Sequence, residues 1–361
     1  MSWPDWIPLR STLKSMSAYG APQVPADATL NTNENPYPPS SELQFEITQA
    51  ISDVVKTLNR YPDRDAVTLR ASLASYINER SETSFGLENI WAANGSNEVI
   101  QSLFLAFGSG NALGFTPSYS MHSLISHVVG TTWINGDRNP DFTFNCAFAV
   151  EQVEALKPSL TFLTTPNNPT GDAVAFAQIE TLARSVGMHN GLLVVDEAYA
   201  EFSPERSAVS LIEKYPHVVV IRTMSKAFAF AGARVGYLVA DPLIVDAMTL
   251  VRLPYHLSAF TQAAAKVALD YRAELLGNVS RLVSARQELV TALENLGLTT
   301  VPSAANFILF TGFKLTSPQL WSALLEKGVL IRDVGLSSYL RVTIGNEAEN
   351  KAFIKALTEI L

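Results

Sequence analysis

Short apolar runs alternate with amphipathic helical stretches through the middle of the chain, from about residue 89 to residue 237. The runs at 160–164, 192–195 and 218–221 lack the polar alternation of a strand that has one face in water. Continuous apolar runs of this length are typical of strands covered on both faces. A helical pattern at 174–186 separates two of them. The alternation therefore predicts a mostly parallel α/β sheet, with ligands at the carboxyl ends of its strands.

The pattern changes to longer helical stretches in the last third of the chain. We expect helices at 260–271, 278–296 and 318–327, an apolar run at 307–310, strands at 329–332 and 339–344, and a last helix from about Glu347. These elements predict a smaller α+β domain at 246–361 that follows a large domain at 41–245. Proline-rich patches at 22–25 and 36–39 indicate that residues 1–40 form an extended arm, which contributes to the small domain and the active site.

The composition agrees with a globular enzyme, because 361 residues that are 47% hydrophobic and 17% charged can bury a large core in two domains. The formal net charge of −8 argues against binding nucleic acid through a broad electrostatic surface. Cys146 is the sole cysteine in the sequence, so no internal disulfide can form. We find neither a signal-peptide pattern nor an apolar stretch of spanning length, and expect a cytoplasmic protein that does not bind membranes.

The candidate chemistry centres on a lysine in a turn rich in Ser, Ala and Gly between two predicted buried strands, where residues 223–236 have the sequence TMSKAFAFAGARVG. The amine of Lys226 can condense with an aldehyde and, once released, can move a proton. Upstream, Asp196 can keep a ring nitrogen protonated, and Tyr199 can donate a hydrogen bond to a ring oxygen. Arg234, with Thr223 and Ser225, offers the donors that a phosphate dianion requires. These requirements are those of pyridoxal phosphate.

Two further segments offer groups for the same cofactor, although each has a simpler explanation. A glycine turn opens a helical pattern at 92–98, where free backbone N–H groups and the helix dipole suit a phosphate. The alternative is an ordinary helix cap at Ser96 or Asn94. The turn-rich segment 165–171 presents Asn168 as an amide donor beside the ring oxygen, or is a plain loop. A lone lysine or aspartate can also have a purely structural role. The prediction therefore depends on the presence of all these residues together, in this order along the chain.

That ordered set of motifs resembles the fold-type I pyridoxal-phosphate-dependent aminotransferases over nearly the whole chain, from about Tyr19 onward. The motifs are Asn33-Glu-Asn-Pro-Tyr37, Tyr61-Pro-Asp, Gly95-Ser-Asn-Glu98, Asn167-Asn-Pro-Thr-Gly171, Asp196-Glu-Ala-Tyr199, Ser225-Lys226-Ala-Phe, Gly232-Ala-Arg234-Val-Gly236-Tyr and Leu340-Arg341-Val-Thr-Ile-Gly345. Within the family, the chain is most similar to the histidinol-phosphate aminotransferases. The resemblance implies a large domain with a mostly parallel seven-stranded sheet, a smaller α+β domain and a homodimer.

The resemblance also implies a role for each matching residue. Lys226 is the Schiff-base lysine, Asp196 is the partner of the pyridinium nitrogen, Tyr199 and Asn168 are donors to the ring oxygen, Tyr119 stacks on the ring, and Ser96 and Asn97 contact the phosphate. Tyr61 reaches the phosphate from the partner subunit. Arg341 takes the α-carboxylate of the glutamate or 2-oxoglutarate partner, while Arg332, with Tyr19 and the Asn33 region, holds the phosphate of histidinol phosphate. The alternative for Arg332 is an ion pair with a neighbouring acid such as Asp333.

The implied reaction is transamination between histidinol phosphate and 2-oxoglutarate, which gives imidazole-acetol phosphate and glutamate. Three alternatives stay open at this point. An aromatic amino-acid aminotransferase would share every cofactor motif, and a pyridoxal-phosphate-dependent amino-acid phosphate decarboxylase would use the same scaffold. A non-catalytic module would keep the fold for sensing or regulation.

Scattered histidines add no further site in this reading. None of His122, His127, His189, His217 and His256 occupies a motif position that we assign to catalysis. The sequence contains one cysteine, and the histidines and this cysteine form no cluster of ligands that would predict a metal centre.

Overall fold

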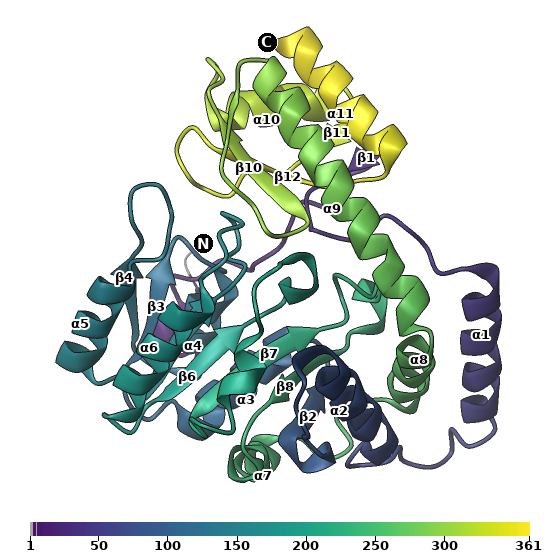
Figure 1. Cartoon of the computed structure of the whole chain (residues 1–361), viewed down its shortest axis with the longest axis vertical. Coiled ribbons are helices and arrows are strands. Elements are labelled where there is room, and N and C mark those ends of the chain that lie inside the picture. Colours follow the sequence, from purple (N-terminus) through teal and green to yellow (C-terminus); the bar gives the residue numbers. More distant parts are fainter. Residues whose placement is uncertain (1–2, 5) are drawn as a thin grey trace.

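A seven-stranded sheet forms the centre of the larger of two bodies in the structure, a computed structural model that describes residues 3–4 and 6–361 (Figure 1). Its strands are β2 (Ile90–Ala93), β3 (Ala112–Thr116), β4 (Trp133–Asp137), β5 (Leu160–Thr164), β6 (Leu192–Asp196), β7 (Val218–Thr223) and β8 (Gly236–Val239), in the order β2-β8-β7-β6-β5-β3-β4. Strand β8 is antiparallel to both of its neighbours, and the other pairs are parallel. The predicted mostly parallel sheet is confirmed.

Alternate side chains of the central strands enter two separate apolar clusters, which explains why these strands are apolar throughout. Val194 and Ile221 face a cluster that includes side chains of α3 (Ser96–Phe107), α4 (Met121–Val129) and α7 (Pro242–Val251). Val195 and Val220 face the larger cluster. That cluster includes side chains of α2 (Val67–Ser81), α5 (Cys146–Leu156), α6 (Phe176–Gly187) and α8 (Ala259–Asp270). The sheet is therefore covered on both faces, as predicted.

The smaller body contains a three-stranded antiparallel sheet of β9 (Thr299–Thr300), β10 (Phe307–Thr311) and β12 (Leu340–Thr343). Helices α10 (Ser317–Glu326) and α11 (Glu347–Ile360) pack beside it, and α9 (Arg272–Asn295) runs from the larger body to the smaller one (Figure 1). In the N-terminal arm, β1 (Ala28–Thr29) pairs in parallel with β11 (Val329–Leu330). The arm therefore supplies a strand to the smaller body.

The remaining elements are α1 (Ser41–Val55) and five 3-10 helices, η1 (Ser11–Leu13), η2 (Leu87–Asn89), η3 (Ala200–Phe202), η4 (Ala208–Leu211) and η5 (Ala231–Ala233). Helix α8, beyond the predicted domain limit at residue 246, packs against α1 and α2 (Figure 1). The exact domain limits stay a prediction. Across the part of the chain that the structure describes, no helix combines the length and the apolar character needed to cross a bilayer.

Helix α9 begins at Arg272, earlier than the predicted start at residue 278. Gly277 weakens the helical signal of this first part, because glycine has a low helix propensity. Leu275 is nevertheless buried in the core. Burial of this side chain stabilises the extra helical turns that local propensity does not favour.

A buried ion-pair network fixes the loop that follows β6. The Arg222 guanidinium on β7 forms ion pairs with Glu197 at 2.8 Å and with Glu201 at 2.9 Å, and the Tyr76 hydroxyl donates to Glu201 at 2.9 Å. Burial alone would lower the pKa of Arg222, but the two carboxylates outweigh it and raise the pKa. Because every charge in the network has a partner, the loop between Asp196 and η3 is held firmly against β7.

Candidate active site

A cavity of about 450 Å³ lies where the carboxyl ends of the parallel strands meet the arm and the smaller body. Thr164, Asp196 and Thr223 are the last residues of β5, β6 and β7, and all three line the cavity. The residues predicted for the site gather here, with the exception of Tyr61: Tyr19, Asn33, Ser96, Asn97, Tyr119, Asn168, Asp196, Tyr199, Thr223, Ser225, Lys226, Arg234, Arg332 and Arg341. Their place agrees with the rule that open α/β sheets bind ligands beyond their carboxyl edges.

Lys226 lies in the loop after β7, with its amine in the cavity. The amine donates a hydrogen bond of 2.8 Å to the backbone oxygen of Thr32 in the arm. Burial lowers the pKa of Lys226 to about 8, and the cations Arg341 and Arg234 act in the same direction, whereas Glu34 opposes them. A substantial fraction of the lysine is therefore a neutral amine at mildly alkaline pH, the form that attacks an aldehyde or accepts a proton.

Asp196 ends β6 and presents its carboxylate to the cavity. One oxygen lies 3.0 Å from Nε2 of His122 on α4, and the other accepts the backbone N–H of Ala198 at 3.2 Å. Both side chains of the Asp196–His122 pair are buried. The His122 ring is fixed between Tyr119 and Phe162, at centroid distances of 5.5 and 4.8 Å. The carboxylate is thus held in one orientation within the cavity wall.

The Tyr199 hydroxyl receives two amide donors. Asn33 Nδ2 lies 2.9 Å from the hydroxyl oxygen, and Asn168 Nδ2 makes a longer contact of 3.5 Å. Burial raises the pKa of Tyr199 to about 12, although Arg341 and the Asn33 hydrogen bond oppose that rise. The phenol therefore keeps its proton at neutral pH and can donate it in a hydrogen bond.

A candidate phosphate site lies where α3 begins. Gly95 is the N-cap residue of this helix and has a φ of 83°, so neither Ser96 nor Asn94 is the cap. A Cβ at Gly95 would lie 2.5 Å from Nη2 of Arg234, so glycine is needed for the approach of this guanidinium. Beside them, the Thr223 hydroxyl donates to Ser225 at 3.0 Å. Helix N–H groups, a guanidinium and two hydroxyls together form a suitable cradle for a phosphate.

Two arginines face the cavity from the smaller body. Arg341 on β12 donates to Asn168 Oδ1 at 2.6 Å and to the Asn31 backbone oxygen at 2.7 Å, while its buried Nε has no partner among the described residues. Burial lowers the pKa of Arg341 to about 10, which leaves it charged at neutral pH. The Arg332 guanidinium lies 5.9 Å from the centre of the Tyr19 ring. No ion pair with Asp333, or with any other described acid, is formed by Arg332.

The model of the family described as aminotransferase class I and II matches residues 27–357. The chain belongs to this family. A histidinol-phosphate aminotransferase of Mycolicibacterium vanbaalenii is 49% identical over 360 residues, which cover 99% of this chain and 96% of the relative. One of Corynebacterium glutamicum (strain R) is 50% identical over 358 residues, which cover 98% and 97%. The family membership predicted from the motifs is therefore confirmed.

A solved aminotransferase has the same fold. The histidinol-phosphate aminotransferase from Sinorhizobium meliloti, in complex with pyridoxal-5'-phosphate, superposes with a TM-score of 0.85 at 23% identity and covers 98% of this chain and 97% of its own. This similarity confirms the predicted fold-type I architecture. The role of each residue in the cavity stays a prediction.

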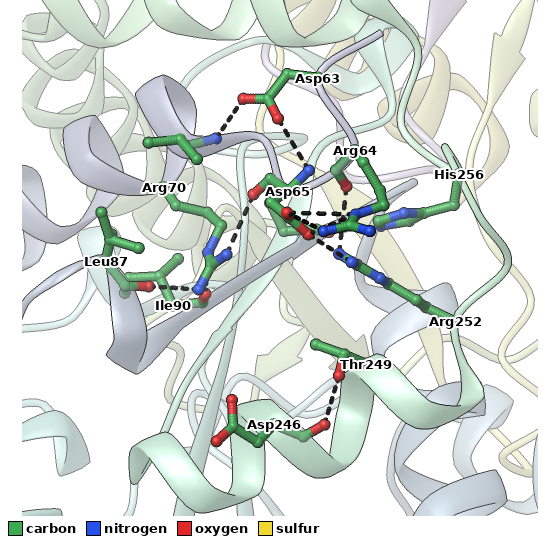
Figure 2. A network of polar contacts seen from close by, with 12 residues as sticks. Asp63, Arg64, Asp65, Arg70, Leu87, Ile90, Asp246, Thr249, Arg252 and His256 are labelled. Carbon is green, nitrogen blue, oxygen red and sulfur yellow. Dashed lines mark hydrogen bonds and ion pairs between the residues drawn. The ribbon is translucent and has the colours of Figure 1, made fainter. Parts of the chain in front are cut away.

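Tyr61 lies outside the cavity of this aminotransferase chain, on the surface of the larger body. Its side chain is 78% exposed and stacks on Tyr255, with ring centroids 4.4 Å apart. Figure 2 shows the polar contacts of the residues that follow Tyr61 in the chain: Asp65 forms ion pairs with Arg64 at 2.9 Å and with Arg252 at 2.5 Å. The Arg64 hydrogen bond and then the Arg252 hydrogen bond lower the pKa of Asp65 to about 2. The Tyr61 segment is thus tied to the loop that follows α7.

The sequence did not identify His122 as a site residue, yet the structure places it against the key carboxylate of the aminotransferase cavity. His122, the second residue of α4, follows Tyr119 by three residues, and Tyr119 lies just before the helix. The sequence separation of 74 positions between His122 and Asp196 does not indicate that the two side chains are in contact. Its imidazole orients the carboxylate and does not line the cavity formed by the described residues.

The pKa of Lys226 leads to a testable pH dependence. In the cofactor-free protein, trapping of Lys226 by a small aldehyde and borohydride is expected to rise with pH and to reach half of its maximum near pH 8, because the neutral amine is the reactive form. Peptide mapping by mass spectrometry separates this lysine from exposed lysines, whose midpoints are expected near about 10.4. An equal midpoint for Lys226 and the exposed lysines would contradict the effect of burial.

Proposed function

We propose that this aminotransferase interconverts histidinol phosphate and 2-oxoglutarate with imidazole-acetol phosphate and glutamate, with pyridoxal phosphate as its cofactor. The observation that carries the proposal is a single cavity that Lys226, Asp196, Arg332 and Arg341 line together. The identity of about 50% to named histidinol-phosphate aminotransferases, over nearly the full length of the chain, supports the same substrate pair.

The residues in the cavity fit the cofactor group by group. Lys226 would hold the aldehyde carbon, Asp196 the ring nitrogen, and the start of α3 with Arg234 the phosphate. Tyr119 would lie against the ring, with Asn168 and Tyr199 at the ring oxygen. When bound, pyridoxal phosphate supplies an electron sink for the bond that breaks at the substrate α-carbon.

Residues of the chain bind the substrate, move the proton and orient the cofactor. Arg341 binds the α-carboxylate of glutamate or 2-oxoglutarate, because its planar guanidinium matches a carboxylate with paired donors. Lys226 would act as the base that moves the substrate α-proton, because its amine lies in the cavity and burial lowers its pKa to about 8. Asp196 presents its carboxyl group to the ring nitrogen, and His122 fixes the direction of that group. Tyr199 keeps its proton and donates toward the ring oxygen.

The two substrates share a feature that one site can recognise. In histidinol phosphate a phosphorylated CH2OH group takes the place that the α-carboxylate has on the reacting carbon of glutamate. Arg332 beside Tyr19 provides a cation for either anion. Asn33 lies close to these residues in the cavity wall. We assign specificity for the phosphorylated substrate to this part of the cavity.

The proposal includes a homodimer and a cytoplasmic location. Tyr61 is exposed and firmly stacked, and the apolar side chains of Leu250 and Leu253 near the end of α7 are also exposed, at 85% and 74%. A second copy that covers this surface would bring Tyr61 to the phosphate site of its partner. A single cysteine suits a reducing compartment.

A half-reaction experiment tests the substrate assignment. The purified protein, loaded with pyridoxal phosphate, is mixed separately with histidinol phosphate, glutamate, phenylalanine and tyrosine, and the visible absorption of the cofactor is followed. Histidinol phosphate and glutamate are expected to convert the spectrum. Conversion by the aromatic amino acids without conversion by histidinol phosphate would instead identify an aromatic amino-acid aminotransferase.

A pair of arginine variants tests the phosphate subsite. Arg332→Gln is expected to raise the half-saturating concentration of histidinol phosphate by about 10-fold or more, since a charge-assisted hydrogen bond is lost. Arg281→Gln is the matched control, because Arg281 stacks on Tyr37 at 4.0 Å and lies away from the cavity. Equal values for both variants and the wild type would remove Arg332 from the subsite.

A further inference from the structure

A chain of buried hydrogen bonds connects the smaller body to the Tyr199 hydroxyl. The hydroxyl of Thr343, at the end of β12, donates to Asn33 Oδ1 at 3.1 Å. The same hydroxyl oxygen accepts the backbone N–H of Asn33 at 3.0 Å. Asn33 Nδ2 then donates to the Tyr199 hydroxyl oxygen at 2.9 Å. All three residues are at least 96% buried, because their exposed fractions are 2%, 2% and 4%.

The direction of these hydrogen bonds is set by chemistry. Because the Thr343 oxygen accepts a backbone N–H, its own proton is free for an acceptor, and Asn33 Oδ1 is that acceptor. The amide of Asn33 must therefore turn its N–H group toward Tyr199. The backbone of Asn33 is fixed as well, since its φ is 56°, a region in which asparagine is favoured, and Asn306 donates to its carbonyl at 3.1 Å.

A second amide approaches Tyr199 with the same polarity. The Arg341 guanidinium can only donate, so Asn168 Oδ1, 2.6 Å away, must face it. Asn168 Nδ2 consequently faces the Tyr199 oxygen at 3.5 Å. The phenol oxygen thus receives N–H groups from two sides, and no described residue accepts its proton. The Tyr199 proton is left to point into the cavity.

We propose that Thr343 and Asn33 are positioning residues that orient the Tyr199 hydroxyl proton into the cavity, toward the ring oxygen of the cofactor. The inference rests on the proposed function, because it deepens the role of the cofactor site. Thr343 is not among the described residues that line the cavity, so it acts only through Asn33. A residue of the smaller body therefore controls a donor that the larger body carries.

The consequence is a property that spectroscopy can measure. A hydrogen bond donated to the ring oxygen stabilises that oxygen as an anion and competes for it with the proton on the nitrogen that joins Lys226 to the cofactor. That nitrogen then loses its proton at a lower pH. If the Tyr199 proton is no longer directed at the ring oxygen, the pH midpoint of the visible absorption change is expected to rise.

The test compares the full-length, cofactor-loaded variants in a pH titration of the visible absorption. Thr343→Val removes the hydroxyl at nearly constant volume and is expected to raise the midpoint by roughly half a pH unit, the effect of a weakened hydrogen bond. Thr343→Ser is expected to keep the wild-type midpoint. Thr161→Val is the matched control, since Thr161 is a buried sheet threonine whose hydroxyl has no partner among the described residues.

Two further variants complete the test. Tyr199→Phe is expected to raise the midpoint by at least as much as Thr343→Val. Asn33→Asp replaces the donor by an acceptor of the same shape, so it is also expected to raise the midpoint, and it serves if Thr343→Val cannot be loaded with cofactor. A midpoint that moves in Tyr199→Phe but not in Thr343→Val or Asn33→Asp would overturn the positioning role. A midpoint unmoved in Tyr199→Phe would instead overturn the proposed place of the cofactor.

Discussion

Replacing Lys226 by alanine is expected to reduce transamination by about 10⁴-fold or more and to abolish the visible absorption band of the covalently bound cofactor. The size of the loss follows from two roles of one amine, since the same group forms the covalent link and moves the α-proton. The amine is already placed for both roles, because it lies in the cavity with a pKa that burial lowers to about 8. Single-turnover kinetics and absorption spectra of the purified variant measure the two losses separately.

The same experiment needs a control variant in which a surface lysine outside the cavity is replaced. Lys327→Ala is suitable, because Lys327 pairs with Glu359 between α10 and the end of α11 and is not among the described residues that line the cavity. This variant is expected to keep the spectrum and the rate of the wild type. A small primary amine added to Lys226→Ala is expected to restore part of the proton-transfer rate, because it can supply the missing base. Borohydride reduction that attached the cofactor to a different lysine would refute the assignment.

Replacing Asp196 by asparagine is expected to lower the rate by about 10²- to 10³-fold, the size of effect seen when one preorganised electrostatic contact is removed. Asparagine has the same shape but no charge, so it cannot stabilise a proton on the ring nitrogen. The loss is therefore electrostatic, and the fold should persist. Transamination rates measured alongside thermal unfolding of the variant would separate these two properties.

A graded series makes the role of Asp196 sharper. His122→Gln keeps the carboxylate but weakens its orientation at the 3.0 Å contact, so a smaller loss of roughly 10-fold is expected. Asp246→Asn, on the outer helix α7, is the control and should leave the rate unchanged. A rate for Asp196→Asn within a factor of about three of the wild type would show that this charge contributes little to catalysis.

Much of the fold could be predicted because its signals are local. The uninterrupted apolar runs of β5, β6 and β7 arise from side chains that enter a separate core on each face of the sheet. Helix α9 shows the limit of such local reasoning. Gly277 lies in its second turn, and the burial of Leu275, a tertiary effect, decides that the helix starts earlier than expected.

The candidate site could be assembled from the sequence where its residues follow strand ends. Asp196 and Lys226 each come at or just after such an end, and parallel strands bring their carboxyl ends to one edge. Arg332 could not be assigned in this way, because a charged residue next to Asp333 equally fits an ion pair. The structure places its guanidinium against Tyr19 in the cavity and forms no such pair with a described residue.

The sequence by itself predicted the chemistry: a lysine, an acid, a phenol and three arginines in the order that one cofactor and its substrates require, on a predicted parallel sheet. Only the tertiary structure showed which other side chains orient these site residues. Asn33 meets Thr343 across 310 positions, and His122 meets Asp196 across 74. These contacts join elements that are far apart in the sequence, so no repeat or local periodicity predicts them. The packing of the arm, the sheet and the smaller body brings the elements together. Tyr61 points away from the cavity of its own chain for the same reason, since its place is set by its stacking on Tyr255.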